Sequence, residues 1–335
     1  MTGRERVRAI FGRRKADRTG FWLGNPHTES WTLYFAAFGL STQAEVRQML
    51  GDDYRWVNCE GGCYKHPKGK PMLINPRSGP GLSAAGALAA CESVQEIHDY
   101  PWPNPEYLDF TAWTAELQAT GDVYRASGFW CPFFHQLADM FGMENYYIRM
   151  FTHPDVVHAA TRHLVDFYLE ANRRLYDRAG GEIDGFFFGN DFGTQLDLLV
   201  GPEQMREFVF PYFKQLTDQA HAHGYQVILH SCGAIHRVIA DLLAMGVDAL
   251  HPLQTLAAHM DAETLARDFG GRVAFLGGID TQQLLVHGSP EEVRADVRRV
   301  RRLLGPHLVV SPSHEALLPN VPPANVRAMA EAALE

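Results

Sequence analysis

Short apolar runs alternate with helix-length segments through the last two thirds of this sequence, and this alternation constrains the fold most. Runs with the length and composition of strands lie at 123–126, 185–189, 225–230, 248–252, 273–280 and 308–312. Helical spacing is present at 153–176, 202–223, 234–245, 262–269, 290–304 and 323–334. Strands that alternate with helices pair in parallel through right-handed crossovers, so an α/β fold is expected.

The N-terminal third supplies the remaining strands. A helix is expected at 3–11, and further strands at 21–25 and near 54–57. Eight strands predict a closed (β/α)8 TIM barrel. The segment 26–120 is rich in glycine and proline, with a short helix near 43–50, and is expected to be a largely irregular insertion capping the barrel mouth. No linker is evident, so 1–335 is expected to form a single barrel domain.

His230 and Cys232 lie where a predicted strand passes into a helix, which is the catalytic edge of a parallel barrel. Residues two apart in extended backbone point to the same side, so the imidazole and the thiolate can converge on one ion. Nitrogen and sulfur ligands favour zinc. A bare pair of this kind is more often a buried histidine beside a core cysteine, and its position at a strand end is what favours a metal.

Polar residues also follow the neighbouring strands. They are Asn190, Asp191, His251, Asp280, His314 and Glu315. A closed barrel brings its last strand near the earlier ones, so His314 is the expected third zinc ligand beside His230 and Cys232. Three protein ligands leave one position for substrate or water, as in catalytic zinc sites. Each polar residue could instead be a cap or turn residue, above all Asp280 before the following helix.

Charge and composition limit the partners and the compartment. The net charge is -9, and no basic block is dense enough to follow a phosphate backbone, so nucleic acid is not an expected partner. No apolar run is long enough to span a membrane, and the N-terminus lacks an apolar signal region. The five cysteines have no framework spacing. A soluble cytoplasmic protein is therefore expected.

Several motifs together carry a family resemblance that extends along nearly the whole chain. They are RERV at 4–7, ADR at 16–18, NDFGTQ at 190–195, FVFPY at 208–212, HSCG at 230–233, GVDA at 246–249, GGID at 277–280 and PPAN at 322–325. The combination resembles the uroporphyrinogen decarboxylase superfamily, and within it the zinc-dependent, corrinoid-linked methyltransferases. The resemblance implies a (β/α)8 barrel, in agreement with the strand count.

Two branches of that superfamily make different demands on the sequence. The decarboxylases work without a metal and hold a substrate with eight carboxylates through an arginine-rich segment after the first strand. Residues 25–35 contain no Arg or Lys, so a metal-free decarboxylase is the less favoured alternative. The methyltransferases carry His-x-Cys here and a cysteine near the last strand. This chain has no cysteine after Cys232 and offers His314 there.

The exchange of a thiolate for a neutral imidazole makes the site one unit less negative and the zinc a stronger Lewis acid for an ether oxygen. We therefore expect a zinc-dependent methyltransferase that moves a methyl group between a small methylated compound, preferably a methoxy compound undergoing O-demethylation, and a corrinoid. Nothing resembles a cobalamin-binding domain, so the corrinoid (cobalamin) is expected in trans, on a corrinoid protein. A homodimer is compatible with the sequence.

Roles for the remaining residues follow from this expectation. Asp191 and Glu315 are the expected catalytic groups, with Glu315 as a temporary ligand or acid. Asn190, Gln195, His251 and Asp280 are the expected substrate-binding residues. Two other functions use the same barrel: a zinc hydrolase with Glu315 or Asp191 as base, and a non-catalytic binder of small molecules.

Overall fold

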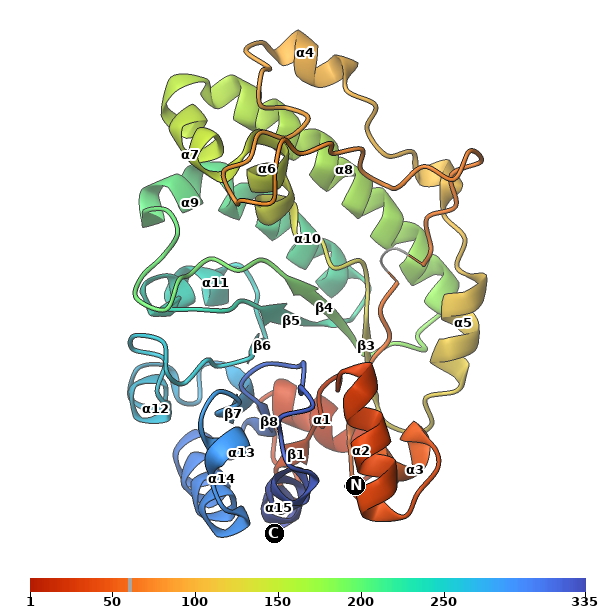
Figure 1. The fold of residues 1–335 in the computed structure, drawn as a ribbon, viewed down its shortest axis with the longest axis vertical. Coiled ribbons are helices and arrows are strands. Elements are labelled where there is room, and N and C mark those ends of the chain that lie inside the picture. The colour runs from red at the N-terminus through yellow and green to blue at the C-terminus, as the bar shows by residue number, and fades with distance from the viewer. Residues whose placement is uncertain (60–61) are drawn as a thin grey trace.

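An eight-stranded parallel sheet forms the centre of the computed structural model, which describes residues 1–59 and 62–335. Its strand order is β1-β8-β7-β6-β5-β4-β3-β2, and helices lie between successive strands (Figure 1). The strands are β1 Gly20–Phe21, β2 Tyr54–Trp56, β3 Tyr124–Ser127, β4 Gly185–Gly189, β5 Gln226–His230, β6 Ala249–His251, β7 Ala274–Ile279 and β8 Leu308–Pro312. The predicted (β/α)8 barrel is confirmed, and it is nearly closed.

Most predicted helices are present. They are α1 Gly3–Phe11, α3 Gln43–Met49, α8 Pro154–Ala179, α12 Ala262–Phe269, α14 Pro290–Leu304 and α15 Pro323–Leu334. The helix predicted at 202–223, with a break or bend expected at Pro211, is divided into α9 Pro202–Phe208 and α10 Phe210–Ala222, because Pro211 has no N–H to continue the ladder. The one predicted at 234–245 begins later, as the 3₁₀ turn η2 His236–Val238 followed by α11 Ile239–Ala244.

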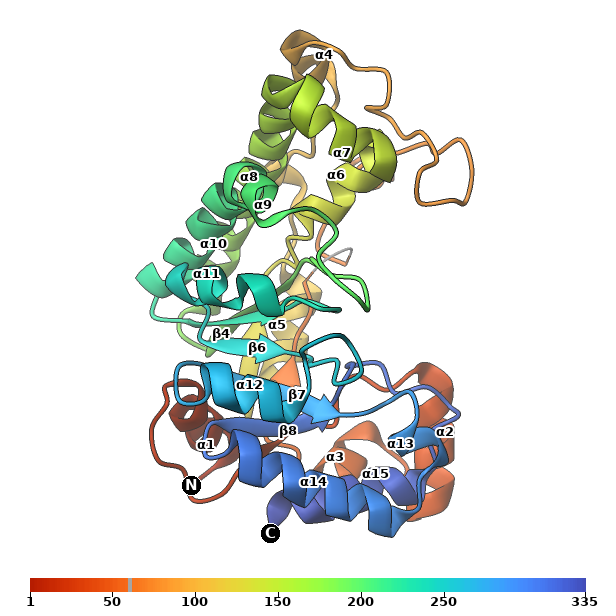
Figure 2. The same ribbon diagram turned by 90° about the vertical axis from the view of Figure 1, so that its left-hand side faces the viewer.

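The segment 26–120 is more helical than predicted, and residues 60–61 within it lie outside the described residues. Besides α3 it contains α2 Thr28–Phe38, α4 Val94–Asp99, the 3₁₀ turn η1 Pro105–Tyr107 and α5 Thr111–Gln118. Three further helices that the sequence did not predict are α6 Phe133–Phe141, α7 Met143–Thr152 and α13 Leu284–His287. Figures 1 and 2 show α4, α6 and α7 together at the end of the molecule away from α14 and α15.

The amino ends of the strands are covered by α1. Its residues Val7, Ile10 and Phe11 are buried among the inward-facing side chains of the barrel. In the barrel interior, the Trp22 and Phe187 rings pack edge to face, with centroids 5.9 Å apart. The barrel is therefore a packed core, and its polar residues gather at the carboxyl ends of the strands.

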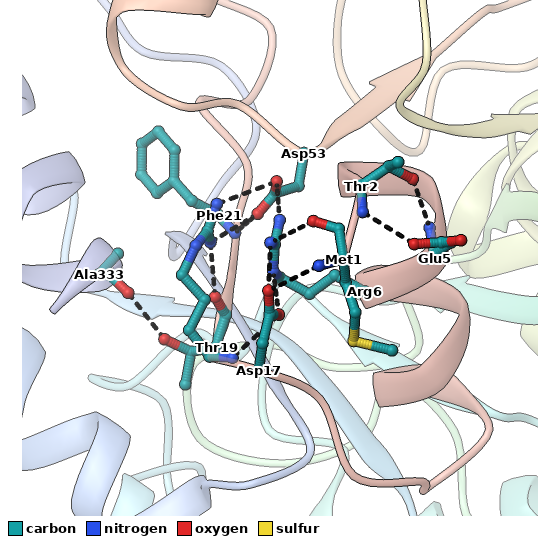
Figure 3. Close-up of polar contacts among 10 residues, drawn as sticks. Met1, Thr2, Glu5, Arg6, Asp17, Thr19, Phe21, Asp53 and Ala333 are labelled. Carbon is teal, nitrogen blue, oxygen red and sulfur yellow. Dashed lines mark hydrogen bonds and ion pairs between the residues drawn. The ribbon is translucent and has the colours of Figure 1, made fainter.

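Side chains close the barrel between β1 and β2. The Asp53 carboxylate accepts the Phe21 N–H at 3.1 Å and a bond from Arg6 at 2.7 Å, as Figure 3 shows, and it also accepts one from Arg18 at 2.8 Å. The Asp53 N–H in turn donates to the Phe21 carbonyl at 2.8 Å. This cluster lies at the amino ends of the strands, where it holds the first two strands together.

Among the described residues, no helix is long and apolar enough to cross a membrane.

Candidate metal centre

Three donor atoms of different kinds converge at the carboxyl ends of β4 and β5. Nε2 of His230 lies 3.4 Å from Sγ of Cys232 and 3.3 Å from Oδ1 of Asp191. All three ligand atoms lie within 4.8 Å of one another. His230 ends β5 and is almost fully buried, whereas Asp191 and Cys232 are partly exposed.

These separations fit a tetrahedral zinc ion. With zinc bonds of about 2.0–2.1 Å to nitrogen or oxygen and about 2.3 Å to sulfur, the edges of a tetrahedron are about 3.3 Å for N···O and about 3.5 Å for N···S. The observed His230–Asp191 and His230–Cys232 distances of 3.3 and 3.4 Å are close to both edges. Asp191, His230 and Cys232 therefore offer a preorganised nitrogen, oxygen and sulfur donor set.

The other ring nitrogen of His230 faces a second group. Its Nδ1 lies 3.0 Å from Nδ1 of His251 and 3.4 Å from Oε2 of Glu315. Oε2 of Glu315 and Nε2 of His251 are buried without a hydrogen-bond partner within the described part of the chain. His251 packs against the rings of Trp22 and Phe187 at 5.3 and 5.2 Å. His251 is thus placed behind His230, where it can fix which nitrogen carries the proton.

The electrostatics of the cluster favour positive charge at His230. Burial would lower the pKa of His230, but the charge of Glu315 and the hydrogen bonds of Asp191 and Cys232 outweigh it and raise that pKa well above 6.5. Burial also opposes ionisation of Asp191, yet His230 holds the pKa of Asp191 well below 3.8. Burial raises the pKa of the Cys232 thiol. A divalent cation would replace the proton and compensate the same carboxylates, so the residues present fit zinc.

Two loops meet to bring Asp191 to Cys232. The Cys232 N–H donates to Oδ1 of Asp191 at 2.8 Å, and the Ala234 N–H donates to the Thr194 carbonyl at 2.7 Å. Gly233 lies between them with φ +86°, and a Cβ there would come within 2.3 Å of the Gly193 carbonyl oxygen. Only glycine fits this approach, so the HSCG motif positions the ligand loop as well as supplying ligands.

His314 was predicted as the third ligand and lies next to the donor set. It belongs neither to the converging ligand atoms of Asp191, His230 and Cys232 nor to those of His230, His251 and Glu315. Its ring centroid is 6.0 Å from that of His230, and its Nδ1 is 3.6 Å from Oε2 of Glu315. That Nδ1 accepts the Ala316 N–H at 3.1 Å. In the neutral ring, Nε2 therefore carries the hydrogen. The Asn25 N–H donates to the Glu315 carbonyl at 2.7 Å and so anchors this loop to the end of β1.

The other predicted substrate-binding residues have structural partners. The Asn190 side chain accepts the Phe134 N–H at 3.0 Å and donates to the Cys131 carbonyl at 2.9 Å. The Asp280 carboxylate accepts three backbone N–H groups that open the turn before α13, which is the capping role weighed from the sequence. These polar atoms are occupied by the fold.

Two further residues border the site: Trp130, which the sequence offered only as one of several aromatic residues for the pocket wall or the core, and Gln254, which it did not single out. The Trp130 ring packs against His230, with centroids 5.1 Å apart. Gln254 accepts the Gly233 N–H at 3.0 Å and the Gln195 amide at 2.9 Å, and it thereby links the loops after β4, β5 and β6. Their positions just past the ends of β3 and β6 are the signal that could have identified them.

Two cavities border the barrel, one among the loops at the carboxyl ends of its strands and one along its side. One of about 320 Å³ borders His314 and Gln254, and no Arg or Lys lines it. Another of about 930 Å³ extends along the side of the barrel at the β1–β2 junction, and neither His230 nor Cys232 borders it. The smaller cavity shares no residue with the donor set, but it borders His314, the neighbour of Glu315, and Gln254, which accepts the Gly233 N–H.

The protein is a parallel (β/α)8 barrel, and its nitrogen, oxygen and sulfur donor set lies at the carboxyl ends of the strands, where barrel enzymes carry their active sites. The family model for uroporphyrinogen decarboxylase (URO-D) matches residues 93–335, and the chain belongs to this family. A uroporphyrinogen decarboxylase from Chlorobium luteolum is 31% identical over 141 residues, which cover 39% of this chain and 37% of that protein. The match thus spans little more than a third of that relative's length.

A solved structure of a methyltransferase from Methanosarcina mazei resembles the whole chain. It superposes with a TM-score of 0.65 over 99% of this chain and 98% of that one. The two sequences are 15% identical, so the likeness establishes the common fold.

Proposed function

We propose that this protein is a zinc-dependent methyltransferase that takes a methyl group from a small methoxy compound and passes it to a corrinoid held by a partner protein. The main observation behind the proposal is the donor set of Asp191, His230 and Cys232. Its His230–Asp191 and His230–Cys232 distances match the edges of a tetrahedral zinc site. Membership of the URO-D family and the fold shared with a methyltransferase support the same reaction class.

In this proposal Asp191 takes the place in the ligand set that the sequence suggested for His314. Asp191, His230 and Cys232 would hold the zinc ion, and the ion would supply a Lewis acid for the ether oxygen of the substrate. His251, 3.0 Å behind His230, holds the imidazole in orientation.

The remaining residues handle the proton. When the carbon–oxygen bond breaks, its electron pair stays on the oxygen, which then needs a hydrogen-bond donor. His314 is suited to donate from Nε2, because its Nδ1 is occupied as an acceptor of the Ala316 N–H. The Glu315 carboxylate lies behind that ring, with Oε2 3.6 Å from Nδ1 of His314. There its negative charge would compensate positive charge on the imidazole.

Two alternatives are less well supported. A metal-free decarboxylase acting on a substrate with eight carboxylates needs basic side chains, but the cavity next to the donor set is lined by no Arg or Lys. A zinc hydrolase would use the same donor set with Asp191 or Glu315 as base, and it would turn over without any corrinoid.

The decisive experiment is methyl transfer to free cob(I)alamin under anaerobic conditions, followed by its visible spectrum. Zinc-loaded protein should form methylcobalamin with at least one of a panel of methoxyarenes and other methyl donors, and Cys232→Ala should lose this activity. Failure with every donor would contradict the proposal, and turnover without corrinoid would favour the hydrolase. Uroporphyrinogen should remain unconsumed.

A further inference from the structure

We infer that the cavity beside His314 binds the methyl donor and selects an uncharged molecule, an inference that rests on the proposed function. The cavity has a volume of about 320 Å³ and is formed by the loops after β6, β7 and β8. Its lining residues are Gln254, Thr281, Gln282, His314, Ala316, Leu318, Asn320 and Val321. None of Gln254, Thr281, Gln282 and Asn320 was a candidate from the sequence.

The cavity is linked to the donor set through two of its lining residues, His314 and Gln254. His314 lies on one side, and Oε2 of Glu315 bridges the space between Nδ1 of His314, at 3.6 Å, and Nδ1 of His230, at 3.4 Å. Gln254 lies on the other side, where it accepts the N–H of Gly233, the residue after Cys232. A molecule in this cavity is therefore separated from the proposed zinc ligands by Glu315 on one side and by the Gln254–Gly233 contact on the other.

The cavity wall has an apolar part and a neutral polar part. Ala316, Leu318 and Val321 form the apolar part. Gln282 and Asn320 contribute amides to the polar part, and neither side-chain amide has a hydrogen bond within the described part of the chain. Such a wall fits a ring or short chain with one or two neutral hydrogen-bonding groups. The volume equals that of about ten water molecules, which limits the donor to a small molecule.

Charge selection follows from what lines the cavity. Among its lining residues there is no Arg, Lys, Asp or Glu, and His314 is the one ionisable side chain. An anionic donor would find no cation in the described lining, and a cationic donor would find neither a carboxylate nor an aromatic cage there. The carboxylate of Glu315, the residue after His314, is directed at His230 and His314. An uncharged methyl ether is therefore the substrate class that the cavity favours.

A matched series of three ligands tests this selection. The probes are 4-methoxybenzyl alcohol, 4-methoxybenzoate and 4-methoxybenzylammonium, which have nearly the same size and differ in charge. Binding to the zinc-loaded full chain is measured by calorimetry or ligand-observed NMR, without corrinoid. The alcohol should bind at least tenfold more tightly than either ion. Equal or tighter binding of an ion, or no binding of any of the three, would overturn the inference.

A charge introduced at the wall locates the binding site. Gln282→Lys should strengthen binding of 4-methoxybenzoate at least tenfold, and Asn320→Asp should do the same for 4-methoxybenzylammonium. The matched control is Gln283→Lys, because Gln283 and Gln282 are neighbouring exposed glutamines and only Gln282 lines the cavity. It should change neither affinity by more than about twofold. Indistinguishable effects of Gln282→Lys and Gln283→Lys would overturn the placement of the donor.

The binding and transfer experiments separate the two proposals. If the alcohol binds selectively and Gln282→Lys shifts the preference, the cavity assignment holds even when no methyl transfer to cob(I)alamin is seen, and the proposed function fails alone. If methyl transfer occurs but its KM for these three donors is unchanged in Gln282→Lys and Asn320→Asp, the cavity assignment fails and the proposed function stands.

Discussion

Oδ1 of Asp191 lies 3.3 Å from Nε2 of His230, at the junction of the loops that follow β4 and β5. The same oxygen accepts the Cys232 N–H at 2.8 Å, so one carboxylate fixes the backbone of Cys232 and approaches the ring nitrogen of His230. This convergence of Asp191 with His230 and Cys232 is an arrangement that the spacing of the sequence does not reveal.

We expect Asp191→Asn to weaken zinc binding by more than about 100-fold, since loss of a ligand charge should exceed the 10–100-fold effect of an outer partner. His314→Ala should weaken it by less than about tenfold. Competition with a chromophoric chelator measures both constants. The reverse order of effects would restore His314 as the third ligand and exclude Asp191 from that role.

Substitution of Gly233 tests the contact between the two loops. Gly233→Ala places a Cβ within 2.3 Å of the Gly193 carbonyl, so the loops must separate and Asp191 must move away from Cys232. Zinc affinity should fall by at least tenfold. Gly224→Ala is the matched control, because Gly224 also has a positive φ, +80°, but has open space around it. Backbone strain should cost each variant about 1 kcal/mol of stability, Gly233→Ala should lose more because its Cβ also clashes with the other loop, and only Gly233→Ala should affect zinc. Equal zinc affinities would show that the close approach has no role.

The barrel closure at β1 and β2 should depend on Asp53. Asp53→Asn leaves the buried guanidinium of Arg6 without one of its carboxylates and weakens the contact with the Phe21 N–H. We expect a loss of about 3 kcal/mol in the free energy of unfolding, measured with urea. Asp17→Asn removes the other carboxylate partner of Arg6. The Asp17 side chain is 41% exposed, so this variant should cost less than about 1 kcal/mol. Similar losses for the two variants would contradict this account.

His221 should make stability depend on pH. Its hydrogen bond with Asp248, at 2.9 Å, raises the pKa of His221 above 6.5. Because the folded pKa is the higher one, the stabilisation is fully present below the unfolded pKa and is lost as pH rises through the folded pKa. His221→Gln should therefore lower stability at pH 5.5 and have little effect at pH 9. The difference should stay under about 1 kcal/mol because the imidazole is 40% exposed.

The control for this pH dependence is His223→Gln. The His223 ring contacts the Gln219 carbonyl at 2.8 Å rather than a carboxylate. Urea unfolding at both pH values should show no comparable change for this variant. An equal loss for His221→Gln at pH 5.5 and pH 9 would show that its role is packing rather than charge.

The regular part of the barrel was predictable because its strands and helices have recognisable local sequence patterns. Apolar runs and helical spacing identified every strand and most helices from 122 onward, and parallel pairing placed His230, Cys232 and His314 at one rim. The helices α2 and α5 were not predicted. In α2 only Ser30, Trp31 and Tyr34 are buried, and apolar residues occur on its other faces as well, so its sequence lacks a clear periodic face.

The sequence by itself determined the barrel, the rim and the kinds of ligand atom available, because side-chain direction in a strand follows from a period of two residues. The tertiary structure alone decided which of those atoms converge. Asp191 joined His230 and Cys232 because Gly233 lets two loops approach closely, whereas Asn190 and Asp280 were taken up by backbone hydrogen bonds. Distances between loops depend on contacts between residues far apart in the chain, and local sequence patterns do not encode them.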